Sequence, residues 1–439
     1  MKNRNPRTFH VKSFGCQMNA YDGERMAELL ESEGMTAAAA GEEADLVVFN
    51  TCHIREKAAE KVYSEIGRAL NREEGDQPMI AVAGCVAQAQ GAEISRRAPG
   101  VDIVVGPQAY HNLPALVREA KAGRRAIDTD MPSISKFGAL PARRRQAPSA
   151  FLTIQEGCDK FCTYCVVPYT RGAEVSRPWT AVIDEAKALI DAGAKEIVLL
   201  GQNVNAWRDG DRGLEHLAAA LDQLPGLERI RYTTSHPNDM SEGLMRAHAE
   251  IASLMPFLHL PAQSGSDRVL KAMNRSHDAQ GYLRIIERVR SARPDIAISG
   301  DFIVGFPGES DAEFEETLNI VREVNYAQAF SFKYSSRPGT PAAEMDGQVP
   351  APVIDERLQR LQALLNEQQI DFNRRSVGQP MKVLIERRGR KPGQMIGKSP
   401  WLQSVHLETS AAIGDLLDVE ILSAGPNSLA GAQLMRNAA

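Results

Sequence analysis

Strand-like and helix-like segments alternate along most of this chain of 439 residues. In the first 147 residues, short apolar runs alternate with longer amphipathic ones. We expect strands over Thr8–Phe14, Leu46–Asn50, Met79–Ala83 and Asp102–Val105, and helices over Asp22–Glu33, Ile54–Asn71 and Gln88–Ala98. This alternation is typical of a parallel sheet with right-handed crossovers. It predicts an N-terminal α/β domain over residues 1–147.

The alternation continues from residue 148 to residue 375, where six strand–helix units follow one another. The expected strands are Phe151–Ile154, Glu196–Leu200, Arg229–Thr233, Phe257–Leu260, Ile296–Val304 and Ala329–Tyr334. Six units predict a parallel β/α barrel that is incomplete, since the full barrel has eight. Leucines at helical spacing from Ala351 to Arg375 predict a trailing amphipathic helix that packs on the barrel.

The composition changes after residue 376, where Gly and Pro separate three strand-like runs. These runs are Met381–Glu386, Trp401–Leu407 and Leu416–Ile421, and they predict a small antiparallel β barrel over residues 376–439. Basic side chains gather in its first hairpins, near Trp401: Arg387, Arg388, Arg390, Lys391 and Lys398. Such a barrel is a reasonable RNA-binding platform, and a solvated packing module is the alternative.

Composition places the chain among ordinary globular proteins, with 43% hydrophobic and 24% charged residues. No apolar run approaches the roughly 18 residues that a membrane span needs, and Met1–Pro6 has no apolar core typical of a signal peptide. We therefore expect a cytoplasmic protein without a membrane partner. The net charge of −5 requires any nucleic-acid site to be a local basic patch.

Three cysteines, Cys158, Cys162 and Cys165, stand in a C-x3-C-x2-C run directly after the first expected barrel strand. Thiolates are the usual ligands of iron–sulfur clusters, and three of them bind three irons of a 4Fe–4S cluster. The fourth iron is then open to a substrate, as the fourth position of a catalytic zinc is. Zinc-binding or structural cysteines are the alternative, but neither a second CxxC pair nor neighbouring histidines support it.

The other three cysteines, Cys16, Cys52 and Cys85, each follow an expected strand of the N-terminal domain. Ligands bind at the carboxyl edge of open parallel sheets, so these thiols are expected to converge on a second cluster. Gly15 and Gly84 precede two of them and allow close approach. Three separately buried cysteines are the alternative. His53 is a further possible ligand, although shaping the turn is its simpler role.

Polar residues also follow five of the barrel strands and indicate a ligand-binding rim at their carboxyl ends. They are Gln202–Asn205, Ser235–Pro237, Gln263–Ser266, Gly305–Glu309 and Ser335–Arg337. Asp301 and Glu309 have a simpler alternative role as helix caps. The basic linker Pro141–Pro148 is an ordinary domain boundary or a strip that contacts phosphate.

The chain as a whole resembles the methylthiotransferase family of radical S-adenosylmethionine (SAM) enzymes. The resemblance rests on motifs that cover nearly the whole chain: Gly15–Asn19, Asn50–Cys52, Gly84–Cys85, Gly157–Gly172, Gly201–Asn205, Leu260–Ser266 and Gly305–Glu309. It implies an N-terminal domain with an auxiliary 4Fe–4S cluster on Cys16, Cys52 and Cys85. It also implies a SAM barrel with a radical-generating 4Fe–4S cluster on Cys158, Cys162 and Cys165, and a C-terminal TRAM domain.

Within that family, the motifs are similar to those of the branch that adds a methylthio group to carbon 2 of N(6)-dimethylallyladenosine at tRNA position 37. The resemblance implies two uses of SAM, as methyl donor and as radical source, and a low-potential electron donor such as a flavodoxin or ferredoxin. Gln263, Ser264 and Arg171 are candidates for the SAM pocket.

Other functions remain open at this stage. Sister branches methylthiolate threonylcarbamoyl-adenosine in tRNA or an aspartate of a ribosomal protein. A two-cluster electron-transfer protein is a second alternative, but it would not need a barrel with a polar rim. An RNA-binding module with structural zinc is a third, and analysis of the bound metal would distinguish it from an iron–sulfur enzyme.

Overall fold

The structure is a computed structural model, and it describes residues 5–39, 41–52, 56–71, 77–131, 136–144 and 146–434. The chain forms two compact units. The first unit comprises Met1–Arg145, Glu156–Asp159 and Cys165–Val175, and the second comprises Gln146–Gln155, Lys160–Tyr164 and Ser176–Ala439. The predicted division into three domains stays a prediction: most of the predicted second domain and all of the third lie in the second unit.

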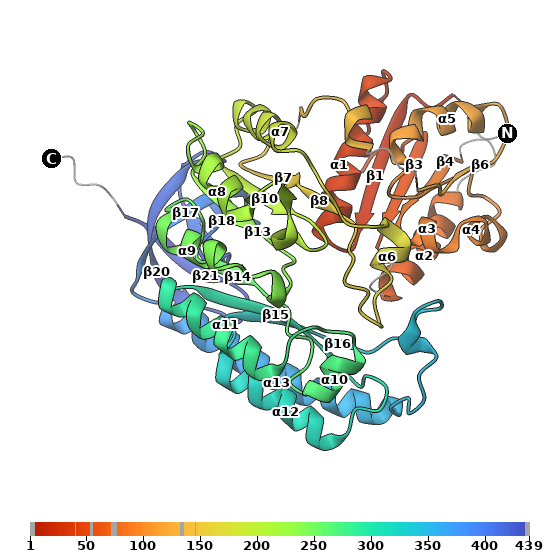
Figure 1. The fold of residues 1–439 in the computed structure, drawn as a ribbon. Coiled ribbons are helices and arrows are strands. Elements are labelled where there is room, and N and C mark those ends of the chain that lie inside the picture. The colour runs from red at the N-terminus through yellow and green to blue at the C-terminus, as the bar shows by residue number, and fades with distance from the viewer. Residues whose placement is uncertain are drawn as a thin grey trace. The chain divides into compact units, whose positions relative to one another are not determined.

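The first unit is built on a six-stranded sheet in which every pair of neighbours is parallel, in the order β2-β1-β3-β4-β5-β6 (Figure 1). The strands are β1 (Thr8–Phe14), β2 (Thr36–Ala37), β3 (Leu46–Thr51), β4 (Met79–Gly84), β5 (Ile103–Val105) and β6 (Ala126–Asp128). Strands β3 and β4 are buried along their whole length, as strands covered on both faces are. The predicted parallel α/β architecture is therefore confirmed.

Helices cover both faces of this sheet and bury a separate apolar cluster on each. They are α1 (Gln17–Ser32), α2 (Glu56–Leu70), α3 (Cys85–Gln90), α4 (Ala92–Arg97) and α5 (Leu113–Lys121), with 3-10 turns η1 (Tyr110–Asn112) and η2 (Lys136–Ala139). The first helix begins five residues earlier than predicted, because Met18 and Tyr21 extend its buried face. The predicted helix Gln88–Ala98 is instead two short helices that meet at Gly91, whose φ is +49°.

The second unit begins with six parallel barrel strands in sequential order, hydrogen-bonded as two groups of three. They are β7 (Ser149–Thr153), β10 (Glu196–Leu200), β13 (Arg229–Tyr232), β14 (Phe257–His259), β15 (Ala297–Val304) and β16 (Gln328–Lys333). This unit also contains the two-residue strands β11 (Arg208–Asp209) and β12 (Arg212–Gly213). Two further short strands, β8 (Gln155–Glu156) and β9 (Val175–Ser176), each have one residue in either unit. The prediction of an incomplete six-strand barrel is confirmed.

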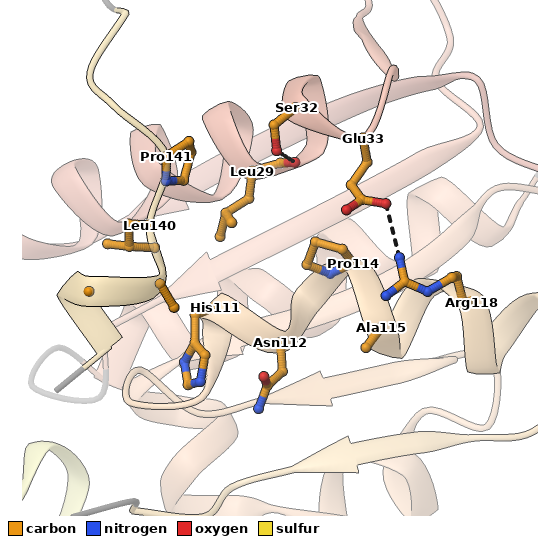
Figure 2. Close-up of a pocket in the computed structure, with 12 residues that line it drawn as sticks. Leu29, Ser32, Glu33, His111, Asn112, Pro114, Ala115, Arg118, Leu140 and Pro141 are labelled. Atoms are coloured by element: carbon orange, nitrogen blue, oxygen red, sulfur yellow. Dashed lines mark hydrogen bonds and ion pairs between the residues drawn. The ribbon is translucent and has the colours of Figure 1, made fainter. Parts of the chain in front are cut away.

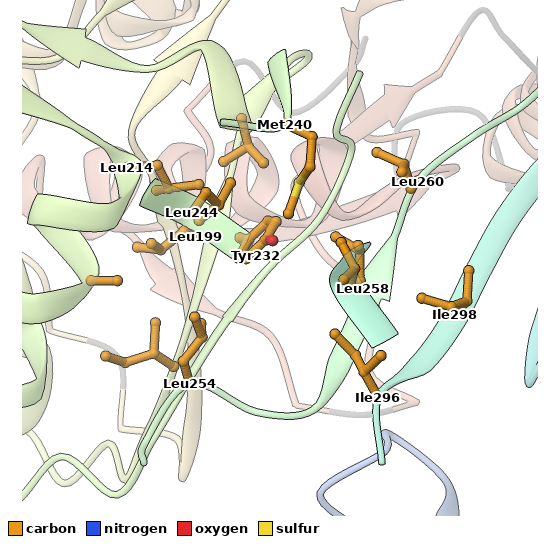
Figure 3. Close-up of a cluster of buried hydrophobic side chains, with 14 of the residues drawn as sticks. Leu199, Leu214, Tyr232, Met240, Leu244, Leu254, Leu258, Leu260, Ile296 and Ile298 are labelled. Atoms are coloured by element: carbon orange, nitrogen blue, oxygen red, sulfur yellow. The ribbon is translucent and has the colours of Figure 1, made fainter. Parts of the chain in front are cut away.

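Helices follow the barrel strands and shield their apolar side chains from water. They are α6 (Val167–Arg171), α7 (Trp179–Asp191), α8 (Leu214–Asp222), α9 (Glu242–Glu250), α10 (Asp267–Ala272), α11 (Ala279–Ala292), α12 (Asp311–Val324) and the trailing α13 (Ala351–Arg375), with η3 (Val204–Ala206), η4 (Pro237–Asp239) and η5 (Pro341–Ala343). Of these helices, α6 belongs to the first unit. Figure 3 shows Leu199, Tyr232, Leu258 and Ile298 of four successive strands in one buried cluster. This core fixes the strands whose carboxyl ends carry the polar rim.

The C-terminal part is a closed barrel of five strands in the order β17-β18-β19-β21-β20. The strands are β17 (Pro380–Arg388), β18 (Gln394–Lys398), β19 (Ser404–Glu408), β20 (Leu416–Ala424) and β21 (Leu429–Gln433). Only β19 and β21 run parallel to one another among these pairs. The sequence patterns did not reveal β18 and β21, and they wrongly placed Trp401 in a strand: it lies in the turn before β19.

Two buried arginines of β13 hold this small barrel against the larger one. Arg229 donates hydrogen bonds of 2.9 and 2.8 Å to the carbonyls of Lys398 and Lys382. Arg231 donates bonds of 2.8 Å to the carbonyls of Pro400 and Ser399. Because Arg229 begins β13, the small barrel packs at the amino ends of the strands, opposite the end that carries the rim.

Candidate functional site

The three N-terminal cysteines lie at the carboxyl edge of the parallel sheet of the first unit. Cys16 follows β1, Cys52 follows β3, and Cys85 begins α3 directly after β4. The strand order reverses at β1, since β2 and β3 lie on its two sides. In open α/β sheets the crevice at this reversal is the usual ligand site. Cys16 and Cys52 flank that crevice, and Cys85 follows the next strand.

Glycines allow the backbones that carry these cysteines to approach one another. Gly15 has a φ of +122°, and a Cβ atom at this position would lie 2.2 Å from the Cβ of Cys52. Gly84 has a φ of +87°, and a Cβ atom there would lie 2.4 Å from Oδ1 of Asn50. Both positions therefore combine a left-handed backbone with a space that no side chain can enter.

A pair of buried asparagines, Asn19 and Asn50, braces the same edge, and no spacing in the sequence links the two. Asn19 donates a 3.1 Å hydrogen bond to Oδ1 of Asn50, and Asn50 donates one of 2.6 Å to the Asn19 carbonyl. The Cys16 thiol donates to Oδ1 of Asn19 at 3.1 Å. The amides thus connect the loop after β1 to the end of β3.

The three thiols have different acidities. The pKa of Cys16 is lowered to about 6, chiefly by a hydrogen bond from Cys52 and further by the positive charge of Arg171, although burial opposes the change. Cys16 also occupies the N-cap position of α1, where the helix dipole favours an anion. Burial raises the pKa of Cys85, and Arg171 partly offsets this. Arg171 is therefore the cation that faces these thiols.

Arg171 belongs to a buried network of two cations and two carboxylates. Its Nη2 donates to Asp22 at 2.6 Å and its Nη1 donates to Glu156 at 3.0 Å. Lys136 donates to the same Glu156 oxygen at 2.7 Å and to the Pro107 carbonyl at 2.7 Å. Burial alone would lower the pKa of Arg171, but Asp22 and its other anionic neighbours hold it above the usual range, so the guanidinium stays charged.

The predicted role of Arg171 as a SAM contact can be compared with the partners that its side chain has in the structure. Both of its terminal nitrogens bind carboxylates, and its backbone carbonyl accepts a 2.9 Å bond from Gln108. The SAM assignment of Arg171 stays a prediction, and its neighbours in the first unit include Cys16 and Cys85 as well as the two carboxylates. No sequence pattern links it to Asp22.

The N-terminal thiols suit an iron–sulfur cluster in donor type and placement. They are soft ligands, they follow adjacent strands, and one of them has a pKa of about 6. Across the described part of the chain, no three Cys, His, Asp or Glu side chains already surround a point as metal ligands do. The three thiols lie on loops that follow neighbouring strands of the sheet. His53 lies outside the described residues.

The C-x3-C-x2-C run is divided between the two units. Cys158 and Cys165 belong to the first unit, and Cys162 belongs to the second. In the first unit, the Cys158 amide donates to the Gly172 carbonyl at 3.2 Å. Gly157 has a φ of +74°, and a Cβ atom there would lie 1.9 Å from the Ala173 carbonyl oxygen. Only glycine fits directly before Cys158.

In the second unit, the residues around Cys162 contact the segment that follows α10. The Thr163 amide donates to the Met273 carbonyl at 3.0 Å, and Asn274 donates to the carbonyls of Lys160 and Phe161 at 3.1 and 3.0 Å. Phe161 itself has a left-handed φ of +47°. Such a conformation persists only where the surroundings hold it.

Gln263 and Ser264, the other two predicted SAM contacts, lie in the rim after β14. Gln263 has a φ of +73°, and its Oε1 is buried without a hydrogen-bond partner among the described residues. Ser264 is buried, lies 3.3 Å from the Thr317 hydroxyl and accepts a 3.2 Å bond from the Ser266 amide. The orphaned amide oxygen and strained backbone of Gln263 fit a ligand contact. The bonds of Ser264 fit a supporting role.

The two acidic residues considered as helix caps, Asp301 in β15 and Glu309 in the rim, do not cap a helix. Ser310 caps α12, with Glu313 completing its capping box. Glu309 instead accepts bonds from the Gly305 amide at 3.1 Å and from Arg357 at 2.7 Å. Asp301 lies 3.5 Å from Nε2 of His259. The capping alternative is therefore wrong for both.

Two predicted RNA contacts are engaged elsewhere. Trp401 donates from Nε1 to the Asp295 carbonyl at 2.7 Å, so its ring packs against the large barrel. In the basic linker, Arg143 is buried and donates to Glu24 at 2.9 Å. Arg145 lies outside the described residues. Of the five basic residues predicted near Trp401, Lys398 is half-buried, and the exposed ones are Arg387, Arg388, Arg390 and Lys391.

A surface pocket of the first unit lies apart from these cysteines. Figure 2 shows it between α1 and α5, with Leu29, Glu33, His111 and Arg118 in its wall. It faces the last turns of α1, a helix of 16 residues that is roughly 24 Å long. Cys16 stands at the opposite end of that helix, so the pocket is not part of the cysteine site.

Comparison with known proteins agrees with this architecture. Residues 8–106 match the uncharacterized protein family UPF0004, residues 152–321 match the radical SAM superfamily, and residues 374–434 match the TRAM domain. A protein of Novosphingobium aromaticivorans named tRNA-2-methylthio-N(6)-dimethylallyladenosine synthase is 67% identical over 97% of this chain and 97% of its own. A protein of Zymomonas mobilis with the same name is 66% identical over 96% of both chains.

The chain belongs to the methylthiotransferase family of radical SAM enzymes. The family resemblance seen in the sequence is thereby confirmed, as are its TRAM domain and its enzymatic nature. Membership implies that this methylthiotransferase uses SAM and a 4Fe–4S cluster.

Solved structures support the fold. The radical SAM methyltransferase TsrM from Kitasatospora setae, solved with cobalamin and a [4Fe-4S] cluster, has a TM-score of 0.57 at 13% identity, covering 77% of this chain and 74% of its own. The cobalamin-dependent enzyme OxsB has a TM-score of 0.53 at 11% identity, covering 83% of this chain and 56% of its own. No helix in the described ranges is both long and apolar enough to cross a bilayer.

Proposed function

We propose that this methylthiotransferase adds a methylthio group to carbon 2 of N(6)-dimethylallyladenosine at position 37 of tRNA. The observation that carries the proposal is the pair of cysteine sets on a chain that matches its named relatives end to end. One set is the C-x3-C-x2-C run, and the other lies at the carboxyl edge of a separate sheet. A reaction that both activates a C–H bond and delivers sulfur uses two such sites.

Each set has its own task in the proposed reaction. Cys158, Cys162 and Cys165 hold a cluster that, with SAM bound, supplies a 5′-deoxyadenosyl radical; Cys16, Cys52 and Cys85 hold the auxiliary, sulfur-handling cluster. An aromatic C–H bond resists ordinary acid–base chemistry, so a cofactor must supply this reactivity. We therefore infer two clusters in the working enzyme.

Residues other than the cysteines bind SAM and support the two cluster sites in this proposal. Gln263 presents its unpartnered amide oxygen to SAM, while Ser264 holds the turn that carries it. Arg171 serves as the positioning cation of the auxiliary site. Its guanidinium faces Cys16 and Cys85, and hydrogen bonds to Asp22 and Glu156 hold it in place. The SAM contact of Arg171 stays a separate prediction.

The TRAM domain contributes tRNA affinity. Arg387, Arg388, Arg390 and Lys391 are exposed on and beyond the end of β17, where they present positive charge to a phosphate backbone. The reaction is placed in the cytoplasm with its tRNA, and a flavodoxin or ferredoxin is the proposed electron donor.

The test is anaerobic incubation of the reconstituted protein with SAM, a reductant and prenylated tRNA that lacks the methylthio group. Digestion and nucleoside mass spectrometry should detect 2-methylthio-N(6)-dimethylallyladenosine, and unprenylated tRNA is the matched control. Release of 5′-deoxyadenosine with product only from threonylcarbamoyl tRNA or the ribosomal protein would contradict the proposed substrate. Iron-loaded, reduced protein that forms neither 5′-deoxyadenosine nor product would contradict the whole assignment.

A further inference from the structure

Within the second unit, the guanidinium of Arg275 contacts Cys162. Nη1 of Arg275 lies 3.8 Å from the Cys162 sulfur, within hydrogen-bonding range for a sulfur acceptor. Nη2 of the same side chain donates to the Pro261 carbonyl at 2.8 Å. Pro261 lies in the rim just after β14, so the guanidinium joins the cysteine loop to the barrel rim.

The backbone around both residues keeps this contact in place. Thr163 donates two hydrogen bonds to the end of α10 and the turn after it. Its amide donates to the Met273 carbonyl at 3.0 Å, and its hydroxyl donates to the Ala272 carbonyl at 2.9 Å. Asn274, in a left-handed conformation with φ of +57°, holds the two carbonyls that precede Cys162. Four hydrogen bonds therefore fix the Cys162 loop to the segment that carries Arg275.

We propose that Arg275 is a positioning residue of the radical-generating site, whose guanidinium donates to the Cys162 thiolate and thereby raises the reduction potential of the cluster held there. The proposal rests on the cluster assignment made under the proposed function. A donor to a ligating sulfur stabilises the added negative charge of the reduced state, and hydrogen bonds to the sulfurs are one of the protein's main controls of cluster potential. A charged donor is stronger than a neutral one.

The chain offers a graded set of variants. Arg275→Gln removes the charge and shortens the side chain, whereas Arg275→Lys keeps the charge but loses the fork that reaches both Pro261 and Cys162. Arg246→Gln, an exposed arginine on α9, is the matched control for charge removal. All are made in full-length protein carrying Cys16→Ala, Cys52→Ala and Cys85→Ala, so that only the cluster on the C-x3-C-x2-C run contributes signal.

The readout is a redox titration of that cluster followed by electron paramagnetic resonance, together with iron content per chain. Arg275→Gln should shift the midpoint to a more negative potential, Arg275→Lys should shift it by less, and Arg246→Gln should leave it unchanged. An unchanged midpoint in Arg275→Gln, with or without a loss of iron, would overturn the proposal and leave a purely structural role for Arg275.

A second measurement needs no substitution and covers the case in which Arg275→Gln does not fold. Protein grown with arginine labelled with ¹⁵N in the guanidinium should show a ¹⁵N coupling in pulsed resonance spectra of the reduced cluster. A cluster signal without that coupling would overturn the proposal for Arg275 and leave the proposed function standing. A chain that binds no iron on Cys158, Cys162 and Cys165 would contradict the proposed function as well.

Discussion

The guanidinium of Arg171 donates a 2.6 Å hydrogen bond to the carboxylate of Asp22, although 149 positions separate the two residues in the chain. This ion pair is fully buried, and it places a fixed positive charge beside Cys16 and Cys85. It links the segment after the C-x3-C-x2-C run to the helix that begins beside Cys16. The proposed auxiliary site is thus supported by residues from two distant parts of the sequence.

Breaking this pair should strongly destabilise the first unit. Asp22→Ala leaves the charges of Arg171 and Lys136 buried with one carboxylate fewer, which costs roughly 3–5 kcal/mol of unfolding free energy. Denaturant unfolding measures the loss. Glu31→Gln, at an exposed position of the same helix, should change the stability by less than about 0.5 kcal/mol. Equal effects of the two substitutions would argue against a structural role for the Asp22 pair.

Adding one methyl group before Cys16 should disable the auxiliary site selectively. Gly15→Ala places a Cβ atom 2.2 Å from that of Cys52, so the two cysteine loops must separate. We expect lower iron content and no methylthiolated nucleoside, with 5′-deoxyadenosine formation retained. Gly34→Ala is the control, because it also has a left-handed φ but meets no atom within 4 Å. Full methylthiolation by Gly15→Ala would show that close approach of these loops is unnecessary.

The second unit should lose stability below pH 6.5 through His248. Burial, reinforced by Arg293, lowers the pKa of His248 to about 3, and the ring shares a 2.7 Å hydrogen bond with Tyr232. The unfolded chain therefore binds a proton that the folded chain excludes, so stability is present above pH 6.5 and falls as the pH drops toward 3. The loss approaches about 1.4 kcal/mol per pH unit within this window.

Thermal unfolding at pH 7.5, 6.5 and 5.5 tests this, with His248→Gln as the comparison because it cannot titrate. The variant should start less stable and then lose less between pH 6.5 and 5.5 than the unsubstituted protein does. If both proteins lost the same stability between pH 6.5 and 5.5, groups other than His248 would cause the acid sensitivity.

Charge removal on the TRAM domain should weaken tRNA binding without affecting SAM cleavage. Arg387→Gln with Arg388→Gln removes two exposed cations, and the slope of log affinity against log salt should decrease by up to about 2. Filter binding over a salt series measures the slope. The double variant Arg246→Gln with Arg284→Gln removes the same charge from exposed positions on barrel helices and should bind as the unsubstituted protein does. Identical salt slopes for the two double variants would exclude this hairpin from the tRNA site.

Much of the fold was predictable because its periodicities are strong. The residues Leu46–Phe49 are all apolar, as in a central parallel strand, and the strand predicted over Leu46–Asn50 extends one residue further, to Thr51. Strand β18 contains Gly397 and two polar residues, so its pattern is weak, and only pairing with β17 and β19 stabilises it. The break at Gly91 likewise depends on one backbone angle that composition does not reveal.

The cysteines of the candidate sites were predictable, whereas their supports were not. Local spacing marks Cys158, Cys162 and Cys165, and position after a strand marks the other three. The contacts of Arg171 with Asp22 and of Arg275 with Cys162 join residues more than 100 positions apart. Trp401 was misjudged because an aromatic beside basic residues resembles an RNA-binding surface, while its indole in fact packs on the large barrel.

The most direct test of the account is to compare two triple variants by mass spectrometry with prenylated tRNA. The triple alanine variant of Cys158, Cys162 and Cys165 should form neither 5′-deoxyadenosine nor methylthiolated nucleoside. The triple alanine variant of Cys16, Cys52 and Cys85 should form 5′-deoxyadenosine but no methylthiolated nucleoside. Methylthiolation by the second variant at the unsubstituted level would contradict the division of labour between the two cysteine sets.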